Sequence, residues 1–540
     1  MIIVDPVKLG GVTCTRASPK WVYDRTGTLV EVPVNTLGVT YDASDLSKAP
    51  YALIEPESKN MLRYSEQFDV TSVWGGASIA VGVNEAVAPS GALTADRLVA
   101  TAFNGAHYRD QEVAGEFSDG ELYTYSVYLK ADTLERVRLD MYYAVGSTGG
   151  YQAVFNLKSG LVESQAVDVR HAEIEVLPNG WCRCWIVGVV AFASAYPARL
   201  LSRIVLVQSS TTTSWSGTGD EAVFAFGAQL VPGEKPMSYI PTTAAAVTRA
   251  ADVIGTGAGL VYSNVPMAEP SYDANATYAK DALVRDPVTH DVYKSLIDAN
   301  KGKPLTDEAS WNPRGKTNRW AMLDEYNNTQ TSNPEEIVIV LSPEAICEGF
   351  YVGNVDADEI ELVVVDQHEG RVYSEVTSLV TASGSSSYYD WCFRPADRAD
   401  YFFTVSLPPY ANALVTVVLR KPGGVAKCGM CAIGLVDEFG PSLYGLSVGG
   451  KDFSSTTFEF DGTSNTVFRD YAKTMNVDVR VNNGEIDYIQ RRLFQLRQRL
   501  IIWIGGPVGA TAVAGRYVSF EIVIPGLLKS DMSLQIEGGV

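Results

Sequence analysis

Residues 122–143 read LYTYSVYLKADTLERVRLDMYY. Two runs of apolar and aromatic side chains, Leu122–Leu129 and Val137–Tyr143, are interleaved with polar residues and separated by a short polar turn. Such alternation is typical of half-buried β-strands, because successive side chains point to opposite faces of a sheet. Similar runs recur at Tyr151–Leu157, Trp181–Val190 and Leu200–Gln208 without helical periodicity. Many short strands of this kind predict a β-sandwich.

The length and composition indicate several folded β domains. The chain has 540 residues, which is too long for one hydrophobic core. Hydrophobic residues make up 46% of it and charged residues 20%, with 47 Gly and 25 Pro, which is typical of a turn-rich folded protein. A second series of strand-like runs follows at Glu336–Leu341, Glu359–Val365 and Ala413–Leu419. We therefore predict a mainly β, multidomain protein.

The net charge and the apolar segments argue against binding to nucleic acid or membranes. The formal net charge of −20 disfavours binding to nucleic acid or to an anionic membrane surface, since both are negatively charged. Residues 1–12 lack the pattern of a secretion signal, and the apolar stretch Trp185–Ala198 is too short to span a bilayer as a helix. We expect synthesis in a cytoplasm and no membrane insertion.

The cysteines are odd in number and widely spaced, which predicts reduced, mostly buried thiols. They are Cys14, Cys182, Cys184, Cys347, Cys392, Cys428 and Cys431. Cys428 and Cys431 have the spacing of a zinc or redox dithiol, but no second Cys or His pair lies nearby in sequence. We predict no structural zinc, no other metal and no cofactor.

A compact aromatic-rich unit occupies residues 272–313. Tyr272, Tyr278, Tyr293 and Trp311 are spread over it and could stack on the apolar faces of sugar rings. In a domain this small, some of them must instead form the core. Of the four, Trp311 and Tyr278 are expected to be the most exposed. A second set of aromatic candidates precedes this unit, namely Trp74, Tyr123, Tyr142, Tyr143, Trp181 and Trp215.

The clearest helix is predicted near the C-terminus, where five apolar residues at three-four spacing form one stripe. They are Ile486, Ile489, Leu493, Leu496 and Leu500. Arg491, Arg492, Arg497 and Arg499 lie off this stripe and face either solvent or an acidic neighbouring subunit. A strand-like IIWIGG segment follows directly.

Residues 14–68, which contain CTRASPKWVYDRTGTLVEV and ALIEPESKNMLRYSEQF, resemble a segment of bacteriophage tail and head-fibre proteins. The resemblance continues through Thr94–Leu98 (TADRL) and Tyr125–Ala131 (YSVYLKA) to Gly227–Asp252 (GAQLVPGEKPMSYIPTTAAAVTRAAD). It implies a lectin-type jelly roll. Residues 272–313 are similar to small chitin-binding carbohydrate-binding modules. Thr317–Leu323, Phe468–Lys473, Ile501–Gly505 and Leu534–Gly538 also look like phage tail proteins.

These resemblances, together with changes in composition and strand pattern along the chain, divide the chain into six parts. They are an N-terminal β segment (1–58), a lectin-like jelly roll (59–252), a linker (253–271), a small carbohydrate-binding-like module (272–315), a second β-sandwich (316–440) and a C-terminal α+β assembly domain (441–540). The fold class is mainly β, with jelly-roll sandwiches, one small aromatic-rich module and one amphipathic helix in the C-terminal domain.

The sequence also contains one hydrolase-like motif. Gly445–Gly449 (GLSVG) fits the pattern of a nucleophile elbow, but all four histidines, His107, His171, His290 and His368, precede Ser447. In hydrolases with this elbow the triad histidine follows the serine. We predict no catalytic residues and expect that the protein is not an enzyme.

The function predicted from the sequence is that of a structural component of a phage tail that binds host-surface glycan for adsorption. Its expected partners are other tail proteins, copies of itself in a homo-oligomer such as a trimer, and host polysaccharide. Two alternatives remain: an architectural tail protein without sugar binding, and a polysaccharide-degrading tail spike, which would require a converging acid and base.

Overall fold

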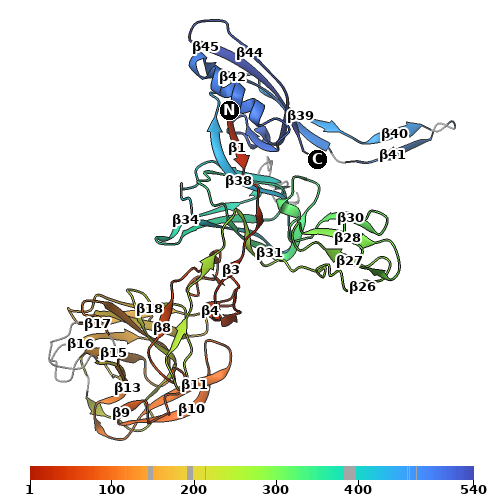
Figure 1. Ribbon diagram of the computed structural model, residues 1–540. Helices are drawn as coiled ribbons and strands as arrows, with labels where there is room; N and C mark the ends of the chain where they lie inside the picture. Colours follow the sequence, from red (N-terminus) through yellow and green to blue (C-terminus); the bar gives the residue numbers. More distant parts are fainter. Residues whose placement is uncertain are drawn as a thin grey trace. The chain divides into compact units, whose positions relative to one another are not determined.

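A computed structural model describes residues 1–115, 117–143, 150–190, 199–212, 214–381, 397–458, 460, 463–469 and 471–539. These residues are mainly in β-strands, with one α-helix near the C-terminus (Figure 1), so the predicted fold class is confirmed. In the described part of the chain no helix is both long and apolar enough to cross a membrane.

The chain forms two compact units. Residues 13–255 form one, which we call the sandwich unit. Residues 1–12 and 256–540 form the other, which we call the discontinuous unit. The six predicted parts are finer than this division, and their limits stay predictions.

The sandwich unit contains two six-stranded antiparallel sheets. The first sheet, in spatial order, is β10 (Ile79–Val87), β11 (Leu93–Ala100), β22 (Ala222–Pro232), β14 (Leu122–Ala131), β19 (Trp181–Val189) and β18 (His171–Val176). The second is β17 (Leu161–Gln165), β16 (Gly150–Asn156), β15 (Arg136–Tyr143), β20 (Arg199–Leu206), β13 (His107–Ala114) and β9 (Gly75–Ala77).

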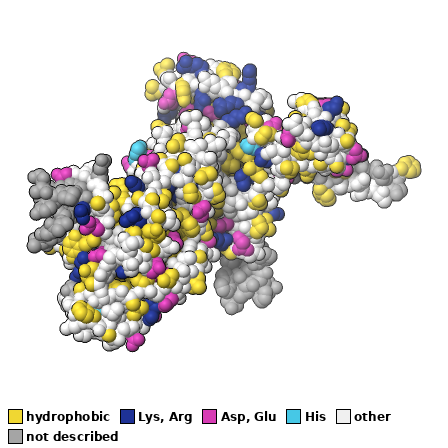
Figure 2. Space-filling model, turned by 60° about the horizontal axis from the view of Figure 1, so that its bottom comes forward, with side chains coloured by type: hydrophobic (Ala, Val, Ile, Leu, Met, Phe, Trp, Pro, Cys, Tyr) yellow, Lys and Arg dark blue, Asp and Glu magenta, His cyan; other side chains and the backbone are white. Residues whose placement is uncertain are grey.

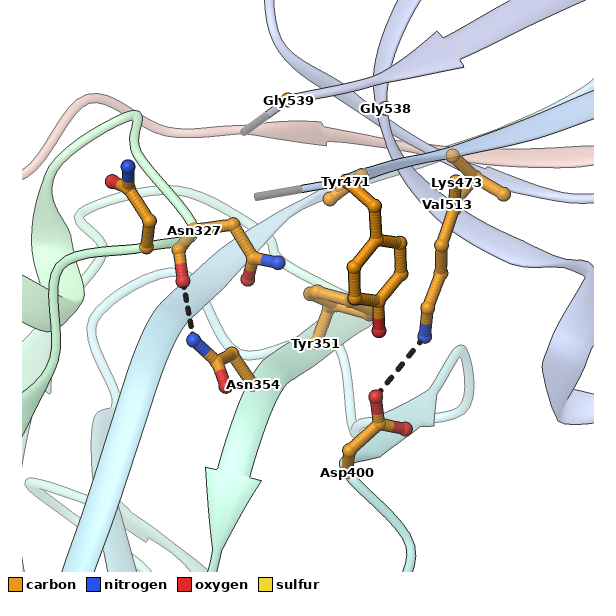
Figure 3. A pocket seen from close by; sticks show the side chains of 11 residues that line it. Asn327, Tyr351, Asn354, Asp400, Tyr471, Lys473, Val513, Gly538 and Gly539 are labelled. Carbon is orange, nitrogen blue, oxygen red and sulfur yellow. Dashed lines mark hydrogen bonds and ion pairs between the residues drawn. The ribbon is translucent and has the colours of Figure 1, made fainter. Parts of the chain in front are cut away.

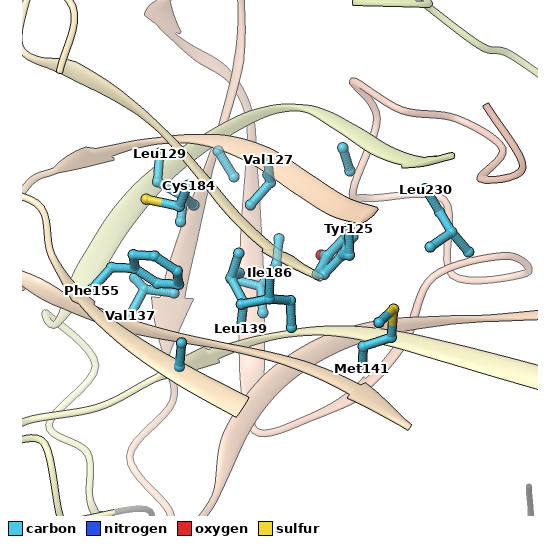
Figure 4. Packing of buried hydrophobic residues seen from close by; sticks show 14 of the residues in the cluster. Tyr125, Val127, Leu129, Val137, Leu139, Met141, Phe155, Cys184, Ile186 and Leu230 are labelled. Carbon is cyan, nitrogen blue, oxygen red and sulfur yellow. The ribbon is translucent and has the colours of Figure 1, made fainter. Parts of the chain in front are cut away.

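The core lies between these sheets, as the alternating pattern predicts. Val127 of β14 and Leu139 of β15 are fully buried, and Figure 4 shows their side chains in one cluster with Ile186 of β19. Cys182 and Cys184 also belong to this core, and they lie on one face of β19.

Residues 13–58 and the end of the unit cover part of the outer face of the first sheet. They include β4 (Lys20–Tyr23), β5 (Leu29–Val32), β8 (Ser58–Asn60) and β23 (Val247–Arg249). A second core forms here, in which Tyr23 packs with Tyr128 and Trp181. Both faces of the central strands are therefore partly buried, which explains why β14 and β19 are nearly continuous in buried residues.

A buried ion network ties the two ends of the sandwich unit together. Arg16 lies 2.8 Å from Asp252, and Lys20 lies 2.7 Å from Asp252 and 2.8 Å from Glu55. Arg249 pairs with Glu55 from the opposite side. Burial opposes ionisation of Glu55, but Lys20 and Arg249 outweigh it and lower the pKa of that carboxyl. The TRAS and TRAAD motifs thus have a structural role.

The discontinuous unit is organised around one large sheet. Its main path is β2 (Gly10–Gly11), β25 (Gly259–Ser263), β31 (Thr331–Ser342), β38 (Leu414–Glu438), β1 (Ile2–Pro6), β43 (Ile501–Ile504), β44 (Ala512–Val523), β45 (Lys529–Gly538), β42 (Tyr471–Asn482) and β39 (Ser447–Asp452). Branches are β32 (Gly349–Asp356), β33 (Glu359–Asp366), β34 (Gly370–Ser378) and β37 (Tyr401–Thr404). The first strand of the chain therefore joins strands that are more than 400 residues away.

The predicted C-terminal helix is present as α2 (Ile486–Gln495). Ile489 and Leu493 are buried against the C-terminal strands, and Leu496 is buried just beyond the last helical residue. The backbone then turns, with Gln498 in the left-handed region at φ 62°, so the stripe predicted to reach Leu500 is longer than the helix.

Two of the four arginines around α2 form ion pairs within the chain. Arg492 lies 3.0 Å from Asp5 of β1 and 3.1 Å from Asp437 of β38, and Arg499 also pairs with Asp5. Arg491 and Arg497 are exposed. A role of these arginines in docking a neighbouring subunit stays a prediction.

Residues 272–316 form a small unit of short strands beside β31 of the discontinuous unit (Figure 1). They are β26 (Thr277–Tyr278), β27 (Leu283–Arg285), β28 (Asp291–Ser295), β29 (Asn300–Lys301) and β30 (Trp311–Lys316). The ring of His290 stacks on Trp320 with centroids 4.0 Å apart, which links this unit to the strands that follow.

Candidate functional site

The four predicted sugar-binding residues of the small unit do not form one exposed platform. Trp311 is 1% exposed, so its expected exposure is wrong. Its ring lies edge-on to both Tyr272 and Tyr278, with centroids 5.8 and 5.5 Å away. The indole N–H donates to the carbonyl oxygen of Lys303 at 3.0 Å. Trp311 is therefore the core of the unit, as expected for a domain with so few apolar residues.

The three tyrosines are half-buried. Tyr272 and Tyr278 stack on each other with centroids 6.0 Å apart, and the Tyr272 hydroxyl donates to Lys303 O at 2.6 Å. Tyr293 lies on β28, and no ring contact joins it to the other three among the described residues. Sugar binding by Tyr272, Tyr278 and Tyr293 stays a prediction.

Most of the second set of aromatic candidates is structural. Trp74, Tyr123, Trp181 and Trp215 are each at most 5% exposed. The three indoles donate to backbone carbonyl oxygens of Tyr64, Val87 and Leu206, respectively. Tyr142 is half-buried, and the side chain of Tyr143 lies outside the described residues.

An open cleft of about 520 Å³ lies on the outer face of the first sheet of the sandwich unit, and we call it the aromatic cleft. One wall comes from residues 21–55 and the floor from β14, β18 and β19. Its aromatic lining residues are Trp21, Tyr23, Tyr41, Tyr51, Tyr128, Trp185 and Tyr239. The ionisable residues besides these tyrosines are Asp42, Glu55, Glu173, Glu175 and Arg183.

Strand register positions the polar floor of this cleft. On β19, Cys182 and Cys184 point into the core, so Arg183 and Trp185 point outward. On the neighbouring β18, Glu175 lies opposite Arg183 and Glu173 lies opposite Trp185. Two carboxylates, a guanidinium and an indole therefore share one patch of the sheet.

The electrostatics of the cleft centre on Glu175. Burial raises the pKa of its carboxyl; Arg183 opposes this shift, while the charges of Asp42 and Glu173 add to it. Burial also raises the pKa of Tyr128 and Tyr239, which keeps these hydroxyls neutral hydrogen-bonding groups.

Several donors in the walls of the cleft lack acceptors. The indole N–H groups of Trp21 and Trp185 and the Nε–H of Arg183 are buried without a hydrogen-bond partner among the described residues. Buried polar groups are nearly always satisfied, so such a group calls for an explanation. Three in one cleft indicate a place where a polar ligand or ordered water completes the hydrogen bonding.

Sequence reasoning missed this site. The sequence prediction selected Trp181, which is covered, and not Trp185. Trp185 lies four residues further along β19 on the same face of the strand. A signal was present in WCRCW (residues 181–185), where two Trp and one Arg occupy the face opposite two core cysteines. An outward Trp-Arg-Trp row is unusual for a solvated face and points to a covered or ligand-binding one.

A smaller polar pocket of about 160 Å³ lies in the discontinuous unit (Figure 3). Lys473 of β42 is directed at Asp400, with 3.3 Å between Nζ and Oδ2. Asn354 donates to the backbone oxygen of Asn327 at 2.6 Å, and the rings of Tyr351 and Tyr471 stand beside these groups. The charged groups here are already paired with each other.

The reactive motifs of the sequence are not assembled into a catalytic or metal centre. Ser447 is the first residue of the edge strand β39, not part of a strand-to-helix turn. Cys428 and Cys431 are buried in β38, and burial raises the pKa of Cys428 to about 12, so this thiol stays protonated. All six described cysteines are buried, as predicted, and Cys392 lies outside the described residues. The described residues contain no group of three His, Cys, Asp or Glu close enough to hold a metal ion.

Comparison with known proteins gives only weak likenesses. No protein-family profile matches the chain, and no curated protein sequence is detectably similar. Among solved structures, the enzymatically active domain of bacteriophage CBA120 tailspike protein 4 matches at TM-score 0.21 and 11% identity, over 32% of this chain. This chain spans 21% of that tailspike chain.

Two further structures are similar at the same level. A carbohydrate-binding module that recognises mannan matches at TM-score 0.20 and 14% identity, over 34% of this chain and 98% of the module. A GH78 family rhamnosidase of Bacillus sp. GL1 matches at TM-score 0.18 and 11% identity, over 78% of this chain and 37% of the enzyme.

Proposed function

We propose that the protein is a structural component of a bacteriophage tail that binds host-surface glycan reversibly through the aromatic cleft. The observation that carries the binding proposal is the cleft itself: Trp21 and Trp185 line one open cavity, and their buried indole N–H groups have no hydrogen-bond partner among the described residues. The phage assignment is supported by the resemblance of residues 14–68 and 227–252 to tail and head-fibre proteins.

The chemistry of the cleft suits a pyranose. A flat indole or phenol ring packs on the apolar face of the sugar, while the sugar hydroxyls take up the free donors and bind the carboxylates. No covalent step is needed. One weak site is sufficient for adsorption, because several copies on a particle convert weak affinity into avidity.

Assembly into the tail is the second part of the proposal, and exposed apolar residues near the C-terminus support it. The hairpin of β44 and β45 presents Ile524, Leu527 and Leu528 at its tip, the last two 95% and 82% exposed. A second hairpin, β40 (Ser455–Phe458) with β41 (Ser464–Val467), projects from the same part of the chain (Figure 1) and is followed by exposed Phe468. Contiguous exposed apolar groups mark protein contacts.

The polysaccharide-degrading alternative has one feature in its favour. Glu173 and Glu175 lie on the same face of β18 in the aromatic cleft, and glycosidases use two carboxyl groups. Release of reducing ends from host polysaccharide by the purified chain, abolished in Glu175→Gln, would favour that alternative. The binding proposal predicts that no reducing ends are released.

Replacing Trp185 with Ala is expected to weaken glycan binding by roughly ten- to hundredfold. The reason is the loss of one stacking surface, since burying a large side chain contributes about 1.5–3 kcal/mol. The measurement is a glycan array followed by titration calorimetry with the full chain. Phe103→Ala, which removes a 59% exposed ring of the same unit, serves as the control and should leave binding unchanged. Equal affinities of the two variants would contradict the site, and a blank array would favour the purely architectural alternative.

Replacing both Leu527 and Leu528 with Ser is expected to reduce incorporation of the protein into particles at least about tenfold, because each buried Leu contributes more than about 1.4 kcal/mol to an interface. Complementation of a phage lacking the protein, with immunoblots of purified particles, measures this. Val167→Ser, at a fully exposed apolar residue of the sandwich unit, is the matched control. Normal incorporation of the double variant would rule out this tip as the assembly contact.

A further inference from the structure

The aromatic cleft is lined by more negative than positive side chains, and not all of the negative ones are paired. Four carboxylates, those of Asp42, Glu55, Glu173 and Glu175, face one guanidinium, that of Arg183. Three of the four carboxylates already have partners. Glu55 pairs with Lys20 and Arg249, Asp42 lies 3.2 Å from Lys48, and Glu173 lies 2.8 Å from His171.

Glu175 is the remaining carboxylate, and no ion pair or hydrogen bond holds it among the described residues. Arg183 lies opposite it on β19 but is engaged elsewhere. Its guanidinium donates to Met237 O at 2.7 Å and sits over the ring of Tyr128, 5.2 Å from the centroid. The cleft therefore contains a half-buried carboxylate that forms no ion pair among the described residues, with Arg183 on the neighbouring strand as the positive charge that acts on its pKa.

Such a carboxylate is unfavourable in the free protein, because desolvation of the charge is not balanced by a partner. A bound cation would reverse this balance. The surrounding indole and phenol rings act in the same direction, since the negative face of an aromatic ring attracts a cation. An anionic sugar such as a uronic acid would instead meet the repulsion of Asp42, Glu173 and Glu175.

We propose that the glycan bound in the aromatic cleft carries a protonated amine, which pairs with Glu175 while the sugar rings stack on Trp21 and Trp185. This inference rests on the proposed glycan binding and names its ligand class: an amino sugar with a free amino group. The indole N–H donors and the amine are complementary, because the former bind sugar hydroxyl oxygens and the latter binds the carboxylate.

The test compares two probes that differ only at the nitrogen: the β-1,4-linked tetrasaccharides of glucosamine and of N-acetylglucosamine. Acetylation removes the positive charge and leaves the sugar rings unchanged. We expect the full chain to bind the glucosamine tetrasaccharide at least about tenfold more tightly in calorimetric titrations at neutral pH. Equal affinities, a preference for the acetylated probe, or no binding of the glucosamine probe would each overturn the inference.

A charge-only variant assigns the preference to the cleft. Glu175→Gln keeps the shape and removes the charge, so the ratio of the affinities for the free-amine and the acetylated probe should fall about tenfold. Glu85→Gln makes the same change at an exposed position of the sandwich unit and should have no effect. An unchanged preference in Glu175→Gln would overturn the inference.

The outcomes also separate this inference from the proposed function. If neutral glycans bind the wild-type chain and Trp185→Ala abolishes that binding, glycan recognition by the cleft stands and only the amine requirement fails. If a broad glycan array gives no binding of any kind, the proposed function itself fails.

Discussion

Replacing Asp252 with Asn is expected to destabilise the sandwich unit by about 3–5 kcal/mol, the usual range for breaking a buried ion pair from one side. Asp252 is the carboxylate shared by Arg16 and Lys20, and all three side chains are inaccessible to solvent. Its removal leaves three buried cations with only Glu55 as a counter-charge. The segment that forms one wall of the aromatic cleft should detach first, because this network holds its beginning to residues 249–252.

Urea denaturation of the full chain, followed by tryptophan fluorescence, measures this effect. Asp132→Asn is the matched control, since Asp132 forms a partly exposed pair with Arg97 at 2.7 Å, for which at most about 1 kcal/mol is expected. If Asp252→Asn were no more harmful than Asp132→Asn, the network would not be what holds the two ends of the unit together.

Replacing Trp311 with Ala is expected to unfold residues 272–316 locally, with a loss of about 3–5 kcal/mol for removal of a core aromatic. The ring is almost fully buried between Tyr272 and Tyr278 and is tied by its N–H to Lys303. A unit this small has no other residue of comparable size in its core.

Hydrogen exchange followed by mass spectrometry reports this unfolding directly. Amides of β27, β28 and β30 should lose protection in Trp311→Ala, while those of the sandwich unit keep it. Tyr326→Ala, which removes a 62% exposed ring, should leave the exchange pattern unchanged. Retained protection combined with lost sugar binding would instead show that Trp311 is a binding residue, as its expected exposure had implied.

The local parts of the fold were predictable from the sequence. The alternation in residues 122–143 predicts β14 and β15, and it also predicts which side chains enter the core, because the period of a strand is fixed. The apolar stripe that begins at Ile486 likewise predicts α2, because apolar residues at three-four spacing fall on one face of a helix. Its end at Gln495 was not predictable, because Leu496 and Leu500 continue the apolar spacing after the backbone has turned.

Long-range contacts explain what was missed. The partners Arg16 and Asp252 are 236 residues apart, and β1 lies between β38 and β43, so no local pattern signals either contact. The cleft arises because residues 21–55 cover Trp181, whereas Trp185, which is 8% exposed, lines the cavity. Both tryptophans obey the same alternation, and only the covering segment distinguishes them.

The sequence predicted the net charge of the protein but not which charged side chains pair with each other. The net charge of −20 argues against an anionic partner, and Figure 2 shows acidic and basic side chains interspersed over the face in view. The composition does not reveal that Glu175 forms no ion pair among the described residues, because pairing depends on which strands become neighbours. The unpaired carboxylate of Glu175 is the basis of the proposed preference of the aromatic cleft for a cationic glycan.

The most direct test of glycan binding by the aromatic cleft is a structure of the full chain with a bound oligosaccharide, determined by crystallography or cryo-electron microscopy. We predict sugar density against the rings of Trp21 and Trp185, with the nearest polar atom of the ligand at Glu175. Density over Tyr272 and Tyr278 with an empty aromatic cleft would contradict the account and return the binding function to the small unit.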